Sequence, residues 1–235
     1  MSLEKENFKK SIFVHIPRTA GTATKYAVPF VSDSYVVSVG EHYTYKAYRE
    51  HLDPTKSKID DYFTFSIIRN PLERLVSLWC SDNFGNITDA RILNQIKELD
   101  PYWVGNTHDK IPFDDYVKNL QNIEDRHEPK GVSDDYLNAL NSYDLLKDED
   151  GEIKINFLLY NKTLKEDIVH LLNEAKTNDK EYTTADVELP DRTTRWGNAT
   201  TPTDKSYLDF YNDETLKIAK KYYEKDFDYF DTNRW

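Results

Sequence analysis

The sequence predicts an α/β fold in which helices flank a central parallel sheet. Runs of strand length that are rich in β-branched and aromatic residues alternate with segments whose apolar residues recur at about 3.6-residue spacing. The strand-like runs are mostly apolar, which suits strands covered on both faces. Because the two patterns alternate along the chain, we expect βαβ units.

Four segments have the length and composition of strands, and the last one follows a predicted turn. This turn lies in KDEDGEIK, with Asp150 and Gly151 at its tightest point. The predicted strands cover residues 11–16 (SIFVHI), 35–39 (YVVSV), 62–68 (YFTFSII) and 153–160 (IKINFLLY).

Six segments have helical periodicity, and one long segment has neither pattern. Residues 177–206, rich in Thr, Asp, Asn and Pro, are predicted to form a long surface loop or a mobile cover. The predicted helices cover residues 46–52, 71–84, 90–99, 113–123, 164–175 and 213–227.

Composition limits the class of protein. A hydrophobic content of 38% and the absence of a linker rich in Gly, Ser or Pro predict one domain over residues 1–235. The sequence has no apolar run of about 18 residues and no signal-peptide pattern in its first ten residues, so we expect a soluble, cytoplasmic protein without a membrane partner. Cys80 is the only cysteine, which excludes an internal disulfide and a cysteine-based zinc site. The net charge of -11 argues against a nucleic acid polymer as partner.

The stretch FVHIPRTAGTAT, residues 13–24, becomes small and polar where the first strand ends. Pro17 would end the strand, and Gly21 would permit a tight turn before a helix that begins near Thr22. Backbone N–H groups at such a turn bind anions, although an ordinary turn with a threonine cap is the alternative. The GxxxxGK[ST] pattern of a Walker A loop is absent. The side chains expected to assist are Arg18, Thr19, Thr22 and Thr24.

A second polar group follows the third predicted strand, in FSIIRNPLERLVSLW. The strand ends at Arg69, Asn70 would cap the next helix, and Pro71 would occupy its first position. The carboxyl ends of neighbouring parallel strands share one crevice, so we expect Arg69 beside the loop of Arg18.

Ser77 lies two helical turns after Arg69 and would join it if strand and helix fold back together. Two anion sites in one crevice suggest a nucleotide with two separate phosphates. In the alternative interpretation, Arg69 only pairs with Glu73, and Ser77 is an incidental helix residue.

These stretches together resemble the sulfotransferases that use 3′-phosphoadenosine 5′-phosphosulfate (PAPS). HIPRTAGTAT is similar to their 5′-phosphosulfate-binding loop, commonly HIPKTGGTS, and RNPLERLVSLW to their 3′-phosphate-binding segment RNPxxRxxSxY. Between them, GEHYTYKAYREHL resembles the GxHxT/S segment of the carbohydrate branch of the family. The order and separation also fit, and weaker similarity extends to residues 155–168 and 207–230.

The resemblance implies a P-loop-like sulfotransferase fold and a donor site without a metal. The 5′-phosphosulfate would lie on the loop, and the 3′-phosphate would meet Arg69 and Ser77. The acceptor would be a hydroxyl on a carbohydrate or a related small molecule; its identity and the oligomeric state stay open. The loop residues implied are Arg18, Thr19, Ala20, Gly21, Thr22, Ala23 and Thr24.

The resemblance also implies the catalytic residues. His42 would accept the proton of the acceptor hydroxyl, with Glu41 as the competing base. Arg18 stands where the family usually has Lys, and it would stabilise the leaving oxygen by fixed hydrogen bonds rather than as an acid. His15 is expected to be structural, and Arg74 to pair with acidic side chains near the site.

Two segments depart from the family pattern, which leaves acceptor recognition open. LPDRTTRWG carries Arg192 and Arg195 where a His and an Asn are more usual, and YNKTL replaces an RFENL-like segment. Two other functions are alternatives. One is a nucleotide-dependent phosphotransferase, and the missing GK[ST] pattern counts against it. The other is a non-catalytic nucleotide-binding module, and the presence of His42 counts against that.

Overall fold

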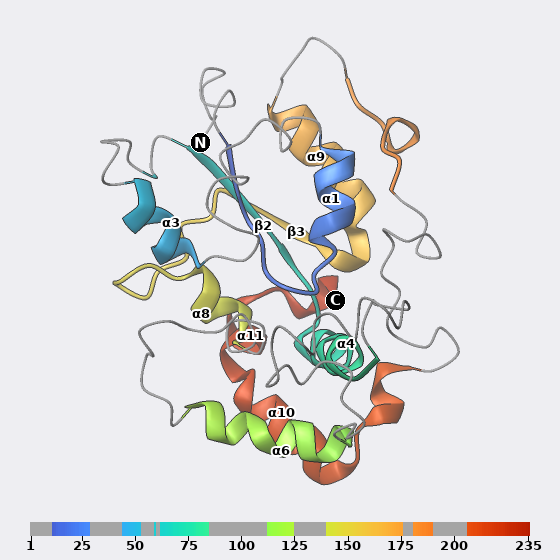
Figure 1. Ribbon diagram of the computed structural model, residues 1–235. Helices are drawn as coiled ribbons and strands as arrows, with labels where there is room; N and C mark the ends of the chain where they lie inside the picture. Colours follow the sequence, from blue (N-terminus) through green and yellow to red (C-terminus); the bar gives the residue numbers. More distant parts are fainter. Residues whose placement is uncertain are drawn as a thin grey trace, which may run out of the picture.

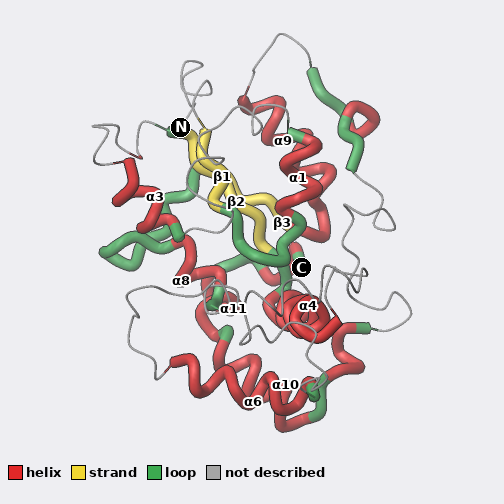
Figure 2. The backbone as a smooth tube through the Cα atoms, in the orientation of Figure 1, coloured by secondary structure: helices red, strands yellow, loops and turns green. Residues whose placement is uncertain are grey.

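Among the described residues, three parallel strands form a sheet at the centre of the protein (Figures 1 and 2). The computed structural model describes residues 11–28, 44–52, 59, 62–84, 112–124, 140–175, 181–189 and 206–235. The strands are β1 (Ser11–Val14), β2 (Phe63–Ile68) and β3 (Phe157–Tyr160), in the order β1-β2-β3. Both pairings are parallel, and the register places Phe13 beside Phe65 and Phe65 beside Phe157. The predicted α/β class is confirmed.

Helices cover both faces of the sheet, as its apolar strands require. Helices α1 (Gly21–Ala27) and α9 (Leu164–Ala175) lie on one side, whereas α3 (Tyr45–Leu52) and α8 (Ser142–Leu146) lie on the other (Figure 1). Successive side chains of β2 point to opposite faces, so Ile67 packs in the α1 and α9 core and Ile68 in the α3 and α8 core.

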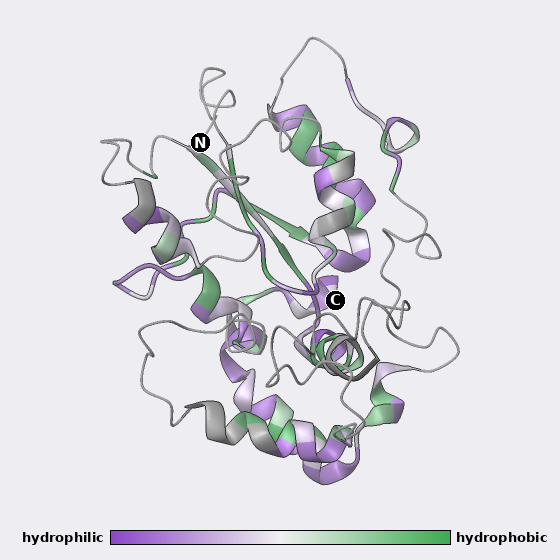
Figure 3. Cartoon of the chain, in the orientation of Figure 1, coloured by the Kyte–Doolittle hydropathy of each residue, from purple (hydrophilic) through white to green (hydrophobic). Residues whose placement is uncertain are grey.

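A third core lies beside the sheet. It joins α4 (Pro71–Phe84) to α6 (Phe113–Glu124) and to α10 (Asp213–Tyr222), with α11 (Glu224–Tyr229) continuing the chain after Tyr223. Helices α6 and α10 lie side by side in Figure 1, and both alternate between apolar and polar residues (Figure 3); Val117, Leu120 and Ala219 are buried in this core. This core fixes α4, which begins directly after β2.

The helices agree closely with the sequence patterns. The predicted boundaries of α4 and α9 are those observed, and α3 begins one residue earlier than expected. The predicted helix over 213–227 is wrong as a single element, because it breaks at Tyr223 into α10 and α11. The predicted strand at 35–39 and helix at 90–99 lie outside the described residues.

Two further differences concern the turns. The turn at Asp150 and Gly151 is confirmed, with Gly151 at φ 82°, but Ile153 forms an antiparallel bridge with Lys147, so β3 begins only at Phe157. Within the predicted long loop, residues 181–189 run along the surface and are anchored to the α1 and α9 core by the buried side chain of Val187.

Candidate functional site

The candidate site lies at the edge of the sheet where all three parallel strands end. β1 continues into the loop 15–20 and α1, and β2 continues through Arg69 and Asn70 into α4. β3 continues into Asn161, which opens a 3-10 turn. The carboxyl edge of a parallel sheet is the usual ligand-binding edge of α/β proteins, because each strand there gives way to a connecting loop.

The loop after β1 holds two residues in the left-handed backbone region. Arg18 has φ 64° and Ala20 has φ 77°, and Ala20 stands immediately before α1. A left-handed conformation is costly for residues with a Cβ, so the surrounding contacts must hold the loop in this shape.

Gly21 serves a different purpose from the one predicted. It lies in α1, and the left-handed turn falls at Arg18 and Ala20 instead. The ring of His15 packs against Gly21 so closely that an added Cβ would lie 1.9 Å from Nε2. The same ring stacks on Phe13 with centroids 5.2 Å apart. Gly21 therefore makes room for a buried histidine that packs between Gly21 and Phe13.

The hydroxyls of Thr19 and Thr24 bond to the backbone of their own segment, whereas the Thr22 side chain is not among the described groups. Thr19 Oγ1 donates to the carbonyl of Ile16 at 2.8 Å, and Thr24 Oγ1 donates to that of Ala20 at 3.3 Å. The intrahelical ladder of α1 begins at Thr24 N–H, which also donates to Ala20 at 3.1 Å. The N–H groups of Gly21, Thr22 and Ala23 precede that bond, so they are the first-turn donors of the helix.

The start of α4 follows the sequence prediction. Asn70 Oδ1 accepts hydrogen bonds from the N–H groups of Leu72 and Glu73, at 2.9 and 3.2 Å, and Pro71 is the first helical residue. The amide is fixed on its other side, because Asn70 Nδ2 donates to the hydroxyl of Tyr207 at 3.3 Å. This cap sets the direction in which α4 leaves the sheet.

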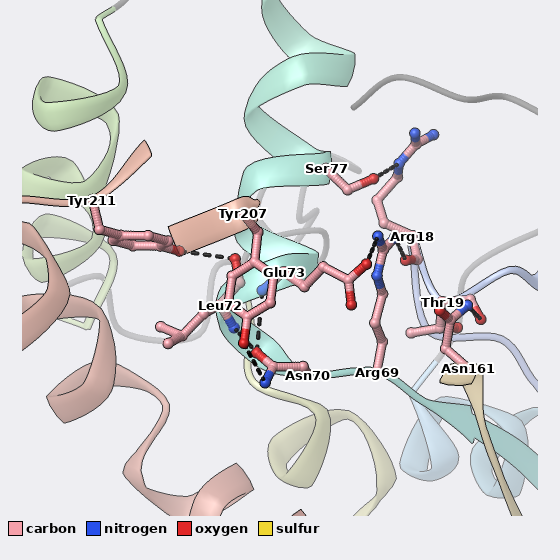
Figure 4. A network of polar contacts seen from close by, with 10 residues as sticks. All are labelled: Arg18, Thr19, Arg69, Asn70, Leu72, Glu73, Ser77, Asn161, Tyr207 and Tyr211. Atoms are coloured by element: carbon pink, nitrogen blue, oxygen red, sulfur yellow. Dashed lines mark hydrogen bonds and ion pairs between the residues drawn. The ribbon is translucent and has the colours of Figure 1, made fainter. Parts of the chain in front are cut away.

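Two arginines and a serine from these elements meet, as Figure 4 shows. Arg18 Nε donates to Ser77 Oγ at 3.2 Å, and Arg69 Nη1 donates to the carbonyl oxygen of Arg18 at 3.0 Å. The predicted proximity of Arg69 to the loop is therefore confirmed, and Ser77 contacts the loop through the side chain of Arg18. Two arginines thus lie together in a protein whose net charge is -11.

Arg69 also makes the ion pair foreseen in the alternative interpretation. Its Nη2 lies 2.8 Å from Glu73 Oε1, with the two side chains 15% and 34% exposed. Its Nε is buried and has no hydrogen-bond partner within the part of the chain that the structure describes. An unpaired buried donor is unfavourable and is typical of a position that a ligand completes.

Arg74 supports the loop after β1 from the protein interior. It is fully buried, and it donates from Nε to the carbonyl of Pro17 at 3.0 Å and from Nη2 to that of Leu140 at 2.8 Å. Among the described residues, its hydrogen-bond acceptors include these two backbone carbonyls. Its charge also acts on a buried carboxyl, that of Asp226, whose pKa is raised by burial although Arg74 opposes the rise.

Cys80 lies one turn beyond Ser77 on α4 and is buried. Burial raises the pKa of its thiol to about 11, while the nearby charge of Arg18 opposes that rise. A protonated, inaccessible thiol is a packing residue rather than a nucleophile.

Sequence reasoning missed two residues at this site. Asn161 Nδ2 donates to the carbonyl of Thr19 at 3.4 Å, so the third strand also touches the loop. Tyr207 comes from the 3-10 turn at 207–210, and burial together with the charge of Glu73 raises its pKa. The YNKTL sequence gives no sign that Asn161 reaches the loop, and Tyr207 has no local sequence signal because its contacts come from distant segments.

The remaining candidates lie outside the described residues. These are Glu41, His42, Arg192 and Arg195. Among the residues that are described, no cluster of His, Cys, Asp and Glu is arranged to hold a metal ion. In the same portion of the chain, no helix has the length and apolar character needed to cross a bilayer.

Comparisons with known proteins give one match. The sequence profile described as "Sulfotransferase family" covers residues 6–232, almost the whole chain. No curated protein and no solved structure gives a significant match.

Proposed function

The chain belongs to the sulfotransferase family, and we propose that its donor is PAPS and its acceptor a hydroxyl on a carbohydrate or related small molecule. Membership of the family assigns sulfuryl transfer from a sulfate donor in general. The donor's identity, the acceptor class and the residue roles are the substance of the proposal.

The observation that carries the proposal is that Arg18, in the loop after β1, contacts both Arg69 at the end of β2 and Ser77 on α4. PAPS carries a phosphosulfate and a separate phosphate on one ribose, so its recognition needs two anion sites close together. Arginine suits both, because its planar fork matches phosphate oxygens and its charge is permanent.

The residues present fit such a donor. The 3′-phosphate would meet Arg69, whose buried Nε lacks a partner within the described chain, together with Ser77. The 5′-phosphosulfate would meet the first-turn N–H groups of α1, which a helix N-terminus directs toward anions. Arg18 lies between the two, because its backbone belongs to the loop and its side chain reaches Ser77.

The proposed chemistry combines this donor site with the base that the resemblance implies. The donor supplies the sulfuryl group, whose sulfur forms a bond to the acceptor oxygen as its bond to the phosphate oxygen breaks. His42 would take the proton of the acceptor hydroxyl, since a neutral imidazole is available near neutral pH. Arg18 would stabilise the negative charge that the departing phosphate oxygen gains. The products are a sulfate ester and adenosine 3′,5′-bisphosphate.

Calorimetric titration of adenosine 3′,5′-bisphosphate tests the donor site, with adenosine 5′-monophosphate as the control ligand. We expect the bisphosphate to bind at least about tenfold more tightly to the wild type, which corresponds to about 1.4 kcal/mol for the second phosphate. Arg69→Ala should remove that preference. The matched control is Arg49→Ala, which removes an exposed arginine of α3 that pairs with Glu149.

Equal binding of the two nucleotides to the wild type would refute the donor assignment. If the preference is present, an acceptor screen follows, in which His42→Ala should lower kcat and leave nucleotide affinity unchanged. The acidic net charge favours neutral acceptors in that screen.

A further inference from the structure

We propose that Glu73 is a positioning residue, which aims the guanidinium of Arg69 so that its Nε edge meets the 3′-phosphate of the donor. The inference rests on the proposed function and extends it to a residue with no assigned role. Its basis is the pattern of contacts around Arg69.

The guanidinium of Arg69 is anchored at two points on one edge. Nη1 donates to the carbonyl of Arg18 at 3.0 Å, and Nη2 donates to Glu73 at 2.8 Å (Figure 4). Two contacts fix the rotation of a planar group that one contact would leave free. The Nε–H, which is buried and has no partner in the described chain, is then held in a single direction.

Arginine binds phosphate best in a bidentate manner, through Nε and one terminal nitrogen. Each terminal nitrogen carries two hydrogens, so Nη2 can donate one to Glu73 and still form such a fork with Nε, which is the nitrogen without a partner in the described chain. A guanidinium free to rotate would lose side-chain entropy on binding, so prior anchoring favours affinity.

Glu73 is itself held in place. It lies in the first turn of α4, its N–H is bound by the Asn70 cap, and a carboxylate there is favoured by the helix dipole. The Tyr207 hydroxyl accepts a hydrogen bond from Asn70 of the same cap at 3.3 Å. Glu73 is thus held by helix α4, and the cap of that helix is also contacted by Tyr207 from a distant segment.

The Glu73 carboxylate has two opposing effects on a bound phosphate. It orients Arg69, which strengthens binding, and it repels the phosphate as a like charge, which weakens binding. Glutamine keeps an acceptor oxygen at the same reach but removes the charge. Aspartate keeps the charge but is one methylene too short to hold the 2.8 Å contact. The two substitutions therefore separate orientation from charge.

The experiment measures the affinities of adenosine 3′,5′-bisphosphate and adenosine 5′-monophosphate for the wild type, Glu73→Ala, Glu73→Asp and Glu73→Gln. We expect Ala and Asp to weaken bisphosphate binding by about tenfold and to leave monophosphate binding within about twofold. Gln should retain or exceed the wild-type preference. The matched control is Glu149→Ala, which breaks an exposed ion pair with Arg49.

Thermal unfolding of each variant separates positioning from simple support of the fold, because a loss of helix stability would lower both affinities together. The inference is overturned if Glu73→Asp keeps the full preference, if Glu73→Ala tightens bisphosphate binding, or if both nucleotides weaken equally. A wild type that does not distinguish the two nucleotides overturns the proposed function as well. A preference that depends on Arg69 but not on Glu73 overturns the positioning role alone.

Discussion

Replacing Gly21 with alanine tests the packing of the loop most directly. An added Cβ would lie 1.9 Å from His15 Nε2, 2.1 Å from Cδ2 and 2.6 Å from Cε1. Ordinary contact begins near 3.4 Å, so the ring would have to move by about 1.5 Å. That movement is hindered, because His15 is buried and stacks on Phe13, which stacks in turn on Phe65.

The magnitude follows from two terms. Overpacking of a buried site costs about 1–3 kcal/mol. Alanine regains up to about 1 kcal/mol of helix propensity over glycine. We therefore expect Gly21→Ala to lower the free energy of unfolding by about 1–2 kcal/mol, measured by urea denaturation with linear extrapolation.

A double-mutant cycle identifies the cause. In the His15→Ala background the ring is absent, so Gly21→Ala should cost nothing or stabilise the protein, giving a coupling energy of about 1–3 kcal/mol. Gly151→Ala is the control. An added Cβ there would lie 3.6 Å from the nearest atom, so the loss of stability would come from the φ of 82° alone and should not depend on His15. The reasoning is refuted if Gly21→Ala costs the same in both backgrounds or does not destabilise the wild type.

Two other variants test the buried groups around the site. Arg74→Met should lower the free energy of unfolding by about 3 kcal/mol, because it leaves the carbonyls of Pro17 and Leu140 without this donor and removes the charge that opposes the raised pKa of Asp226; a loss below about 1 kcal/mol in urea denaturation would contradict this. Burial raises the pKa of the Cys80 thiol from 9.0 to about 11, so the thiol loses its proton at a lower pH in the unfolded chain than in the folded protein. The free energy of unfolding should therefore fall as pH rises from 9.0 to about 11. Cys80→Ala should remove about 2–3 kcal/mol of that decline, and an identical pH dependence in both proteins would show that the thiol does not contribute.

Much of the fold and part of the site could be predicted from the sequence. The three described strands, the boundaries of α4 and the Asn70 cap depend on apolar periodicity and on capping chemistry, which are properties of a few adjacent residues. The proximity of Arg69 to the loop followed from a topological rule for parallel sheets rather than from any contact.

Other features could not be predicted because they depend on pairs of residues far apart in the chain. The sequence shows that Glu73 is one turn from Arg69. It does not show that Tyr207, 137 positions after Asn70, bonds to the Asn70 side chain that caps α4. Likewise, Asn161 reaches Thr19 across 142 positions. A side chain that carries no local pattern acquires such a role only when packing brings its partner within hydrogen-bond distance.

The sequence by itself determined the alternation of strands and helices, the order of the two anion-binding segments and their resemblance to sulfotransferases. The tertiary structure decided where the polar side chains point. It placed the Arg74 side chain in the interior against Pro17, gave Gly21 a steric role beside His15, and directed the Arg18 side chain onto α4. The physical reason is that burial of apolar surface is encoded residue by residue, whereas hydrogen-bond partners are fixed only after distant segments have packed.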